Sequence, residues 1–253
     1  MNYDLNQLEF RMEGEGRPLL FLHGWGRNLD AFAPIISQLP DEYKIITLSL
    51  PGFGNSPEPA KAWTVEEYAA LVTAFLNEKL TPEERAQLLC VTHSYGGRLA
   101  GKIRSFRKLV QIAAAGIKPK RSLKYRFGLF CYKVLKASAA IPIIGCAFKR
   151  PHIAYRNLRS SDDYKNASPV MKEALNFAVN HDQKKDFAKI TCPTLLIWGD
   201  ADVTTPLWMG RTMEKLIEDS ALIVYPNATH QVLTERASEI AVVIDDFFKQ
   251  PEP

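Results

Sequence analysis

The sequence predicts an α/β protein in which a mostly parallel sheet of eight strands carries helices on both faces and is interrupted by an inserted helical region. Two observations predict this class. Short apolar runs bounded by glycine or proline alternate along the chain with segments of helical periodicity, which is typical of a covered parallel sheet. A basic stretch with no strand pattern separates the earlier alternating segments from the later ones. With 253 residues, the chain is long enough for one large domain that contains such an insertion.

The expected strands are short apolar runs, which fit strands buried on both faces of a parallel sheet. Near the start, the segment LNQLEFRM at residues 5–12 is expected to add an antiparallel hairpin at one edge of the sheet. The other strands are expected over residues 18–26, 44–50, 88–91, 108–116, 194–200 and 221–226.

Helical periodicity predicts the connecting segments. Residues 30–39 form the first expected helix, which Pro40 ends. Thr64 begins the second, because Glu67 follows it three residues later and the pair forms a capping-box pattern. A short helix is expected over residues 96–106, and each of the last two strands is followed by a further helical segment.

The basic stretch predicts a helical cap over residues 118–186, between core segments 1–117 and 187–253. It holds 15 Lys or Arg and 5 Asp or Glu, a net charge of +10, whereas the rest of the chain carries a net charge of −6. Residues 169–180 predict one cap helix, and another follows from four apolar residues at helical spacing: Leu123, Phe127, Phe130 and Val134.

The charge of the cap is expected to lie on a solvated outer face, rather than to form a surface for an anionic membrane or an acidic carrier. Nucleic acid is not an expected partner, because no recognised binding motif accompanies the charge. The oligomeric state is left open.

Cysteine usage and the N-terminal segment bear on the compartment. The four cysteines are scattered, form no C-x-x-C pair and have no histidine at ligand spacing, so we expect reduced thiols in a cytoplasmic protein without a metal or other cofactor. The first residues lack the charged start and apolar run of a signal peptide. No segment holds about 18 uninterrupted apolar residues, so no transmembrane helix is expected.

Candidate catalytic side chains follow the expected strands, at the edge where open parallel sheets place their ligands. Ser94 follows residues 88–91 and precedes Gly96 and Gly97, whose small size suits a sharp turn from strand to helix. His230 follows a later strand. A serine in such a turn and a histidine from another strand end predict a nucleophile and its general base.

Two carboxylates follow residues 194–200, and they are expected to differ in role. Asp202 lies further along the loop and could reach an imidazole, so it is the expected acid, whereas Asp200 is expected to cap the strand-end turn. The backbone N–H groups of Trp25 and Tyr95 are expected to stabilise the negative oxygen that develops during attack on a carbonyl.

Two further histidines flank these groups. His23 is expected to support the HGWG loop through hydrogen bonds, and His93 to be a packing residue in the pocket wall.

The motifs HGWG, LPGFGNS, HSYGG, GDADVTTP and NATH, in this order and at this spacing, resemble the α/β-hydrolase fold superfamily over nearly the whole chain. The first two are similar to those of microbial carboxylesterases, including the pimeloyl-carrier-protein methyl ester esterases, and the segments GIKPKRSLKY and DDYKNASPVM resemble the helical cap of small bacterial members. The resemblance implies that Ser94 is the nucleophile, His230 the general base and Asp202 the acid that orients it. It also implies that the N–H groups of Trp25 and Tyr95 form the oxyanion hole.

Three features depart from the family pattern. Thr92 stands where the first glycine of the serine motif is usual. Ser49 replaces the aspartate that usually precedes L-P-G-F-G, which is expected to remove a buried carboxylate near the oxyanion loop. The helix after Ser94 is shorter than usual. We expect these departures to affect stability and pocket shape more than the chemistry.

A serine nucleophile argues against relatives that use aspartate at this place to open epoxides or displace halides. A basic cap argues against aminopeptidases, whose caps hold the substrate amine with carboxylates. We therefore expect a carboxylic ester hydrolase that acts on small acyl or aryl esters through an acyl-enzyme on Ser94. A lactonase, a C–C bond hydrolase with the same triad and a slow-turnover ligand-binding protein are the alternatives. Four cap aromatics are expected to help line an apolar pocket: Phe127, Phe130, Tyr155 and Tyr164.

Overall fold

The computed structural model describes residues 3–118 and 167–251. Most of the expected cap, residues 118–186, lies outside the described residues, so the division into core and cap stays a prediction. The four aromatic residues expected to line a pocket from the cap also lie outside the described residues: Phe127, Phe130, Tyr155 and Tyr164.

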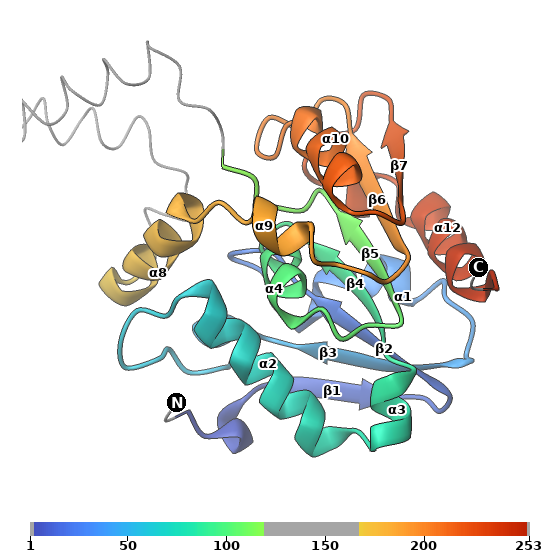
Figure 1. The fold of residues 1–253 in the computed structure, drawn as a ribbon. Helices are drawn as coiled ribbons and strands as arrows, with labels where there is room; N and C mark the ends of the chain where they lie inside the picture. Colours follow the sequence, from blue (N-terminus) through green and yellow to red (C-terminus); the bar gives the residue numbers. More distant parts are fainter. Residues whose placement is uncertain (1–2, 119–166, 252–253) are drawn as a thin grey trace, which may run out of the picture.

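The described residues form one mostly parallel sheet, which confirms the expected fold class. The sheet has seven strands in the order β1-β3-β2-β4-β5-β6-β7, against the eight that the sequence predicted (Figure 1). The strands are β1 Phe10–Glu13, β2 Arg17–Leu22, β3 Tyr43–Leu48, β4 Leu89–His93, β5 Lys108–Ile112, β6 Thr194–Gly199 and β7 Ser220–Tyr225.

The expected antiparallel strand at the edge of the sheet is confirmed, but the expected hairpin is wrong, because β1 pairs with β3 and not with its neighbour in sequence. β1 runs antiparallel to β3 at the edge of the sheet, whereas β2 lies parallel to β3 on its other side. Gly14 and Gly16, at φ 80° and 115°, turn the chain past the start of β3. A Cβ atom on Gly14 would lie 2.5 Å from the carbonyl oxygen of Tyr43. This close passage takes β2 to the far side of β3.

Within the described residues, the expected helices are present with one exception, and two short helices, Pro82–Ala86 and Lys184–Phe187, were not predicted. Residues 30–39 form a 3₁₀ turn followed by a single helical turn rather than one helix. The capping box is present, since Thr64 Oγ1 accepts from the N–H of Glu67 and the Glu67 carboxylate accepts from the N–H of Thr64. The elements are η1 Leu5–Gln7, η2 Leu29–Phe32, α1 Ala33–Ile36, α2 Val65–Lys79, α3 Pro82–Ala86, α4 Tyr95–Ile103, α8 Pro169–Asn180, α9 Lys184–Phe187, α10 Leu207–Leu216, α11 Val232–Glu235 and α12 Ala237–Lys249.

Helices cover both faces of the sheet, and alternate residues of each strand pack against them. Leu20 and Leu22 of β2 face the core shared with α2, α4, α9 and α10, whereas Leu19 and Phe21 face the core shared with α1, α11 and α12. Figure 1 shows α2, α4 and α9 on one side of the sheet, with α1 and α12 on the other. Because both faces are covered, the loops at the carboxyl ends of the parallel strands are where polar side chains can gather.

Within residues 3–118 and 167–251, no helix has both the length and the apolar character needed to cross a membrane.

Candidate active site

Ser94 occupies a strained turn between β4 and α4. Its backbone has φ 49° and ψ −108°, a conformation that a residue with a side chain rarely adopts. The next helix packs so closely that a Cβ atom on Gly96 would overlap the carbonyl oxygen of Leu22, and one on Gly97 would lie 2.5 Å from Cβ of Ala114. Gly96 and Gly97, which were predicted to allow the sharp turn, are therefore both needed for this close packing.

His230 lies between Ser94 and Asp202 and contacts both. Its Nε2 is 3.0 Å from Ser94 Oγ, and its Nδ1 is 2.8 Å from Asp202 Oδ2. A carboxylate can only accept, so Nδ1 carries the proton and Nε2 presents its lone pair to the serine hydroxyl. The Asp202 side chain is fully buried, which keeps water away from this contact. The structure thus brings together three residues that lie far apart in the sequence.

Asp202 rather than Asp200 reaches the imidazole. Asp202 Oδ1 accepts from the N–H groups of Thr204 and Thr205 at 2.7 and 2.8 Å. Burial acts to raise the pKa of Asp202, but hydrogen bonds from His230 and Thr205 outweigh it and hold this pKa below its ordinary value. Asp200 is exposed and accepts instead from the N–H of Asn227 at 2.7 Å, which is the turn-capping role expected of it.

Thr205 is a member of this cluster that the sequence analysis missed. Its side chain is buried, and its hydroxyl lies 2.8 Å from Asp202 Oδ2, 3.2 Å from His230 Nδ1 and 3.0 Å from the carbonyl oxygen of Ala113. The hydroxyl therefore touches both partners of the Asp–His contact and ties them to the end of β5. A hydroxyl residue three positions after the acid, in the sequence DVTTP, is the signal that could have identified it.

The loop from His23 to Leu29 passes beside Ser94. A Cβ atom on Gly24 would lie 2.9 Å from Nδ1 of His93 and 3.2 Å from Cβ of Ser94, so glycine lets the backbone pass close to both residues without a shift. The Trp25 ring packs edge-on against Tyr95 at 5.1 Å between ring centroids. Tyr95 is the first residue of α4, so its N–H has no acceptor within the helix. The two backbone segments expected to stabilise an oxyanion therefore flank the serine.

His23 supports this loop, as the sequence predicted. Its Nε2 accepts from the N–H of Leu50 at 2.9 Å, and its Nδ1–H donates to the carbonyl oxygen of Gly24 at 2.7 Å. Complete burial lowers the pKa of His23 to about 4, so the ring is neutral at ordinary pH. Both ring nitrogens are used in holding the loop.

His93 packs in the wall of the site, and it also makes a specific contact. Its Nε2–H donates to the carbonyl oxygen of His230 at 3.0 Å, and the two rings lie 4.9 Å apart. Burial, followed by the nearby His230, lowers the pKa of His93 to about 3, so this ring too is neutral. His93 therefore fixes the backbone that carries His230.

Position 49 lacks a carboxylate, as expected, but a half-buried carboxylate from elsewhere in the chain lies beside it. The Glu9 carboxylate lies next to Ser49, with 2.5 Å between Ser49 Oγ and Glu9 Oε2. It also accepts from the backbone N–H of Asn55 at 2.8 Å and from the Asn55 side chain. A negative charge is therefore present beside the loop, but it comes from the segment just before β1. Sequence reasoning missed Glu9 because nothing local relates it to position 49.

Thr92 lies inside β4, between Leu22 of β2 and Gln111 of β5. Its side chain is fully buried, and its hydroxyl is 3.5 Å from a carbonyl oxygen of β5, which is long for a hydrogen bond. The threonine thus belongs to the strand, and the sharp turn begins after it.

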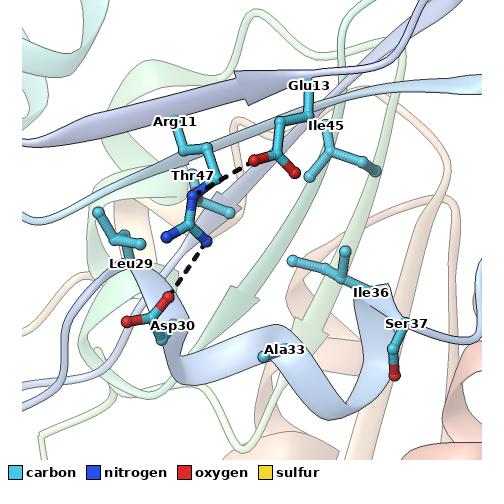
Figure 2. A pocket seen from close by; sticks show the side chains of 9 residues that line it. All are labelled: Arg11, Glu13, Leu29, Asp30, Ala33, Ile36, Ser37, Ile45 and Thr47. Carbon is cyan, nitrogen blue, oxygen red and sulfur yellow. Dashed lines mark hydrogen bonds and ion pairs between the residues drawn. The ribbon is translucent and has the colours of Figure 1, made fainter.

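A separate cavity of about 220 Å³ lies between the β1–β3 edge and the turn that follows the loop, away from Ser94. Figure 2 shows Arg11 reaching across it to Glu13 and Asp30, over an apolar wall that includes Leu29 and Ile36. The ion pairs measure 3.4 and 3.2 Å. Ser94, Asp202, Thr205 and His230 are all absent from the lining of this cavity. Among the residues that the structure describes, no group of His, Cys, Asp or Glu side chains is arranged to hold a metal ion.

Comparison with known proteins shows which family the sequence resembles. A model of the alpha/beta hydrolase family matches residues 19–243. A pimeloyl-[acyl-carrier protein] methyl ester esterase from Aliivibrio salmonicida (strain LFI1238) is 24% identical over 264 residues, covering 97% of each chain. The uncharacterized hydrolase YugF from Bacillus subtilis (strain 168) is 24% identical over 248 residues, covering 91% of this chain and 89% of that one.

Solved structures share the fold at lower identity. An esterase from Exiguobacterium antarcticum has a TM-score of 0.72 at 19% identity, covering 96% of each chain. A bromoperoxidase from Bacillus anthracis has a TM-score of 0.73 at 20% identity, covering 96% of this chain and 95% of that one. Neighbours with different activities at this identity support the fold and leave the reaction to be argued from the site.

Proposed function

The chain belongs to the alpha/beta hydrolase family, and from this premise we propose that it is a serine hydrolase that cleaves small acyl or aryl carboxylic esters. The observation that carries the proposal is the 3.0 Å contact between His230 Nε2 and Ser94 Oγ, with Asp202 holding the opposite ring nitrogen. A serine hydroxyl is a weak nucleophile until a base removes its proton, and this contact supplies the base.

Acylation begins when Ser94 Oγ attacks the ester carbonyl carbon and its proton passes to His230 Nε2. The imidazolium that forms is stabilised by Asp202, whose lowered pKa keeps it ionised. The carbonyl oxygen becomes negative and accepts hydrogen bonds from the N–H groups of Trp25 and Tyr95. The intermediate then collapses, the bond to the leaving alcohol oxygen breaks, and His230 donates its proton to that oxygen.

Deacylation repeats these steps with water. His230 removes a proton from the water, whose oxygen attacks the acyl carbon, and the proton then passes to Ser94 Oγ as the acid leaves. Thr205 holds Asp202 and His230 in place through both halves of the reaction, since its hydroxyl lies within 3.2 Å of each.

A methyl ester carried on an acidic carrier protein is a second candidate substrate. Its support is the name of the relatives at about a quarter identity, together with the net charge of +10 over residues 118–186. Positive charge attracts a negatively charged carrier and raises the rate of encounter, with an effect that salt weakens.

A substrate panel tests the proposal. We expect p-nitrophenyl acetate and butyrate to be hydrolysed by the native chain and not by Ser94→Ala. Turnover of acyl-homoserine lactones or vinylogous diketones in preference to esters would replace the ester assignment with a lactonase or a C–C bond hydrolase. A single burst without steady turnover would instead identify a ligand-binding protein that acylates once.

A further inference from the structure

We propose that Glu9 is a positioning residue for the oxyanion loop, which is here residues 23–29. Glu9 lies just before β1, and its carboxylate holds Ser49. Ser49 and the next residue, Leu50, contact the two ends of the loop. The inference rests on the proposed function, because it assigns to Glu9 an effect on the oxyanion-stabilising groups of that site.

The Glu9 carboxylate is the acceptor of three hydrogen bonds. Oε2 accepts from Ser49 Oγ at 2.5 Å and from the N–H of Asn55 at 2.8 Å, and Oε1 accepts from the Asn55 side-chain amide. Desolvation acts to raise the pKa of Glu9, but the hydrogen bonds from Ser49 and Asn55 leave it below the ordinary value. The carboxylate is therefore ionised and makes charge-assisted hydrogen bonds, which are stronger than neutral ones.

Ser49, which Glu9 holds, contacts the far end of the oxyanion loop. Ser49 Oγ donates its proton to Glu9 and accepts from the N–H of Leu29 at 3.1 Å. The next residue, Leu50, donates its N–H to His23, which begins the loop. Two adjacent residues thus fasten the two ends of the loop, and Glu9 fixes the direction in which the Ser49 hydroxyl points.

The chain also closes around this carboxylate. Gly54 has φ 54°, and a Cβ atom there would overlap both Glu9 Oε2 and Ser49 Oγ. Two other hydrogen bonds would hold Ser49 without the carboxylate: its N–H donates to the carbonyl oxygen of Glu9 at 2.8 Å, and Ser56 Oγ donates to its carbonyl oxygen at 2.6 Å. Removal of the Glu9 side chain is therefore expected to loosen the loop while leaving the chain folded.

Arg11 provides a matched control two residues away. Arg11 forms an ion pair with Asp30, in the 3₁₀ turn that directly follows the loop, as Figure 2 shows. The two side chains of this pair are 51% and 56% exposed. Exposed ion pairs contribute little to stability, and this one involves no backbone group of the loop.

The first experiment compares Glu9→Ala with Arg11→Ala. We expect Glu9→Ala to lower kcat for p-nitrophenyl butyrate about fivefold with KM changed less than twofold, because oxyanion stabilisation acts on the transition state. Arg11→Ala should change kcat less than twofold. Equal kcat in the two variants would overturn the proposal.

The second experiment moves the carboxylate to position 49. Ser49→Asp alone places a second negative charge against Glu9 and should lower both the thermal midpoint and kcat. The double variant Glu9→Ala/Ser49→Asp restores one carboxylate at this place, and we expect its kcat to return to within about twofold of the native value. A double variant no better than Glu9→Ala would show that the carboxylate has no positioning role.

A readout without turnover separates this proposal from the ester hydrolase assignment. The chain has four tryptophans, and the indole N–H signal of Trp25 can be assigned with Trp25→Phe. Glu9→Ala should shift that signal and speed its hydrogen exchange, whereas Arg11→Ala should not. If the native chain hydrolyses no ester while the Trp25 signal responds in this way, the proposed function fails and the loop contact stands. An unchanged Trp25 signal in Glu9→Ala would overturn the loop contact itself.

Discussion

The two sides of Ser94 are held in different ways. On the acid side, Asp202 is buried and accepts from Thr204, Thr205 and His230, all through short contacts. On the oxyanion side, the loop is held by a neutral histidine, a serine hydroxyl and a half-buried carboxylate from just before β1.

The two sides differ in whether a charged side chain contacts the reacting residues. The acid side keeps an ionised carboxylate in contact with the imidazole, so its contribution is large and local. The oxyanion side places a neutral ring, His23, beside the loop and relies on the position of backbone N–H groups. Five changes test this contrast, from the largest expected effect to the smallest.

Asp202→Asn should have the largest effect. The amide keeps the shape of the side chain but removes the charge and allows the wrong tautomer of His230, so kcat should fall roughly 10³–10⁴-fold. Steady-state kinetics with p-nitrophenyl butyrate measures this fall in kcat. Asp200→Asn is the matched control, and its kcat should fall less than about twofold. If the Asp200 variant lost more activity than the Asp202 variant, the acid would be misassigned.

Gly24→Ala tests the oxyanion side. The new Cβ atom would lie 2.9 Å from His93 Nδ1 and 3.2 Å from Cβ of Ser94, so the loop must move away from the nucleophile. We expect kcat to fall about 10²-fold, as for the loss of one oxyanion donor, with a smaller change in KM. Native kcat in a folded variant would mean that the position of the loop does not matter to catalysis.

The neutral histidines predict how stability depends on pH. His23 and His93 have pKa values of about 4 and about 3 in the folded chain, below the ordinary value of about 6.5. At pH values between the folded and the ordinary pKa, the unfolded chain binds protons at these histidines and the folded chain does not. The free energy of unfolding therefore falls as pH drops below about 6.5. Each histidine should contribute a loss of roughly 2 kcal/mol at pH 5 relative to pH 7.5.

Urea denaturation at pH 7.5 and pH 5 measures this loss. His93→Leu lacks one of the two groups, so the difference between its free energies of unfolding at the two pH values should be smaller than in the native chain. An unchanged difference would mean that His93 binds protons equally in the folded and unfolded chains, so that its pKa is not lowered by folding.

Thr205→Val removes the hydroxyl beside Asp202 and keeps the volume. We expect kcat to fall about tenfold with KM nearly unchanged, because one hydrogen bond to a charged group is lost. Thr205→Ser keeps the hydroxyl and should retain kcat within about threefold. The reverse order, with valine active and serine inactive, would show that this residue only fills space.

Thr92→Gly should have the smallest effect on activity. The threonine lies inside β4 and touches none of the reacting groups, so kcat should stay within about twofold. The lost methyl contacts and the added backbone freedom of glycine in a strand should lower the free energy of unfolding by about 1 kcal/mol. Loss of activity in a folded variant would give the threonine a role that its buried contacts do not explain.

Features formed by residues close together in the sequence could be predicted, whereas contacts between distant segments could not. Thr64 with Glu67, and Ser94 with Gly96, are patterns within a few residues, and the structure contains both the capping box and the sharp turn. Asp202 could be preferred over Asp200 because the reach of a loop residue can be judged from its place after the strand.

Contacts between distant segments were missed. The pairing of β1 with β3 depends on how the chain passes Tyr43, and the contact of Glu9 with Ser49 joins residues 40 positions apart. Thr205 was missed for another reason. Its place three residues after the acid is visible in the sequence, but its contact with His230 exists only once the loops after β6 and β7 lie side by side.

The proposed reaction depends on Ser94 as the nucleophile that His230 activates. The most direct test is covalent labelling with a serine-directed phosphonate, followed by mass spectrometry of the intact chain and its peptides. One label per chain on the peptide that contains Ser94, none on Ser94→Ala, and loss of ester hydrolysis in step with labelling are the expected results. A label on another residue, or undiminished hydrolysis by Ser94→Ala, would show that Ser94 is not the nucleophile.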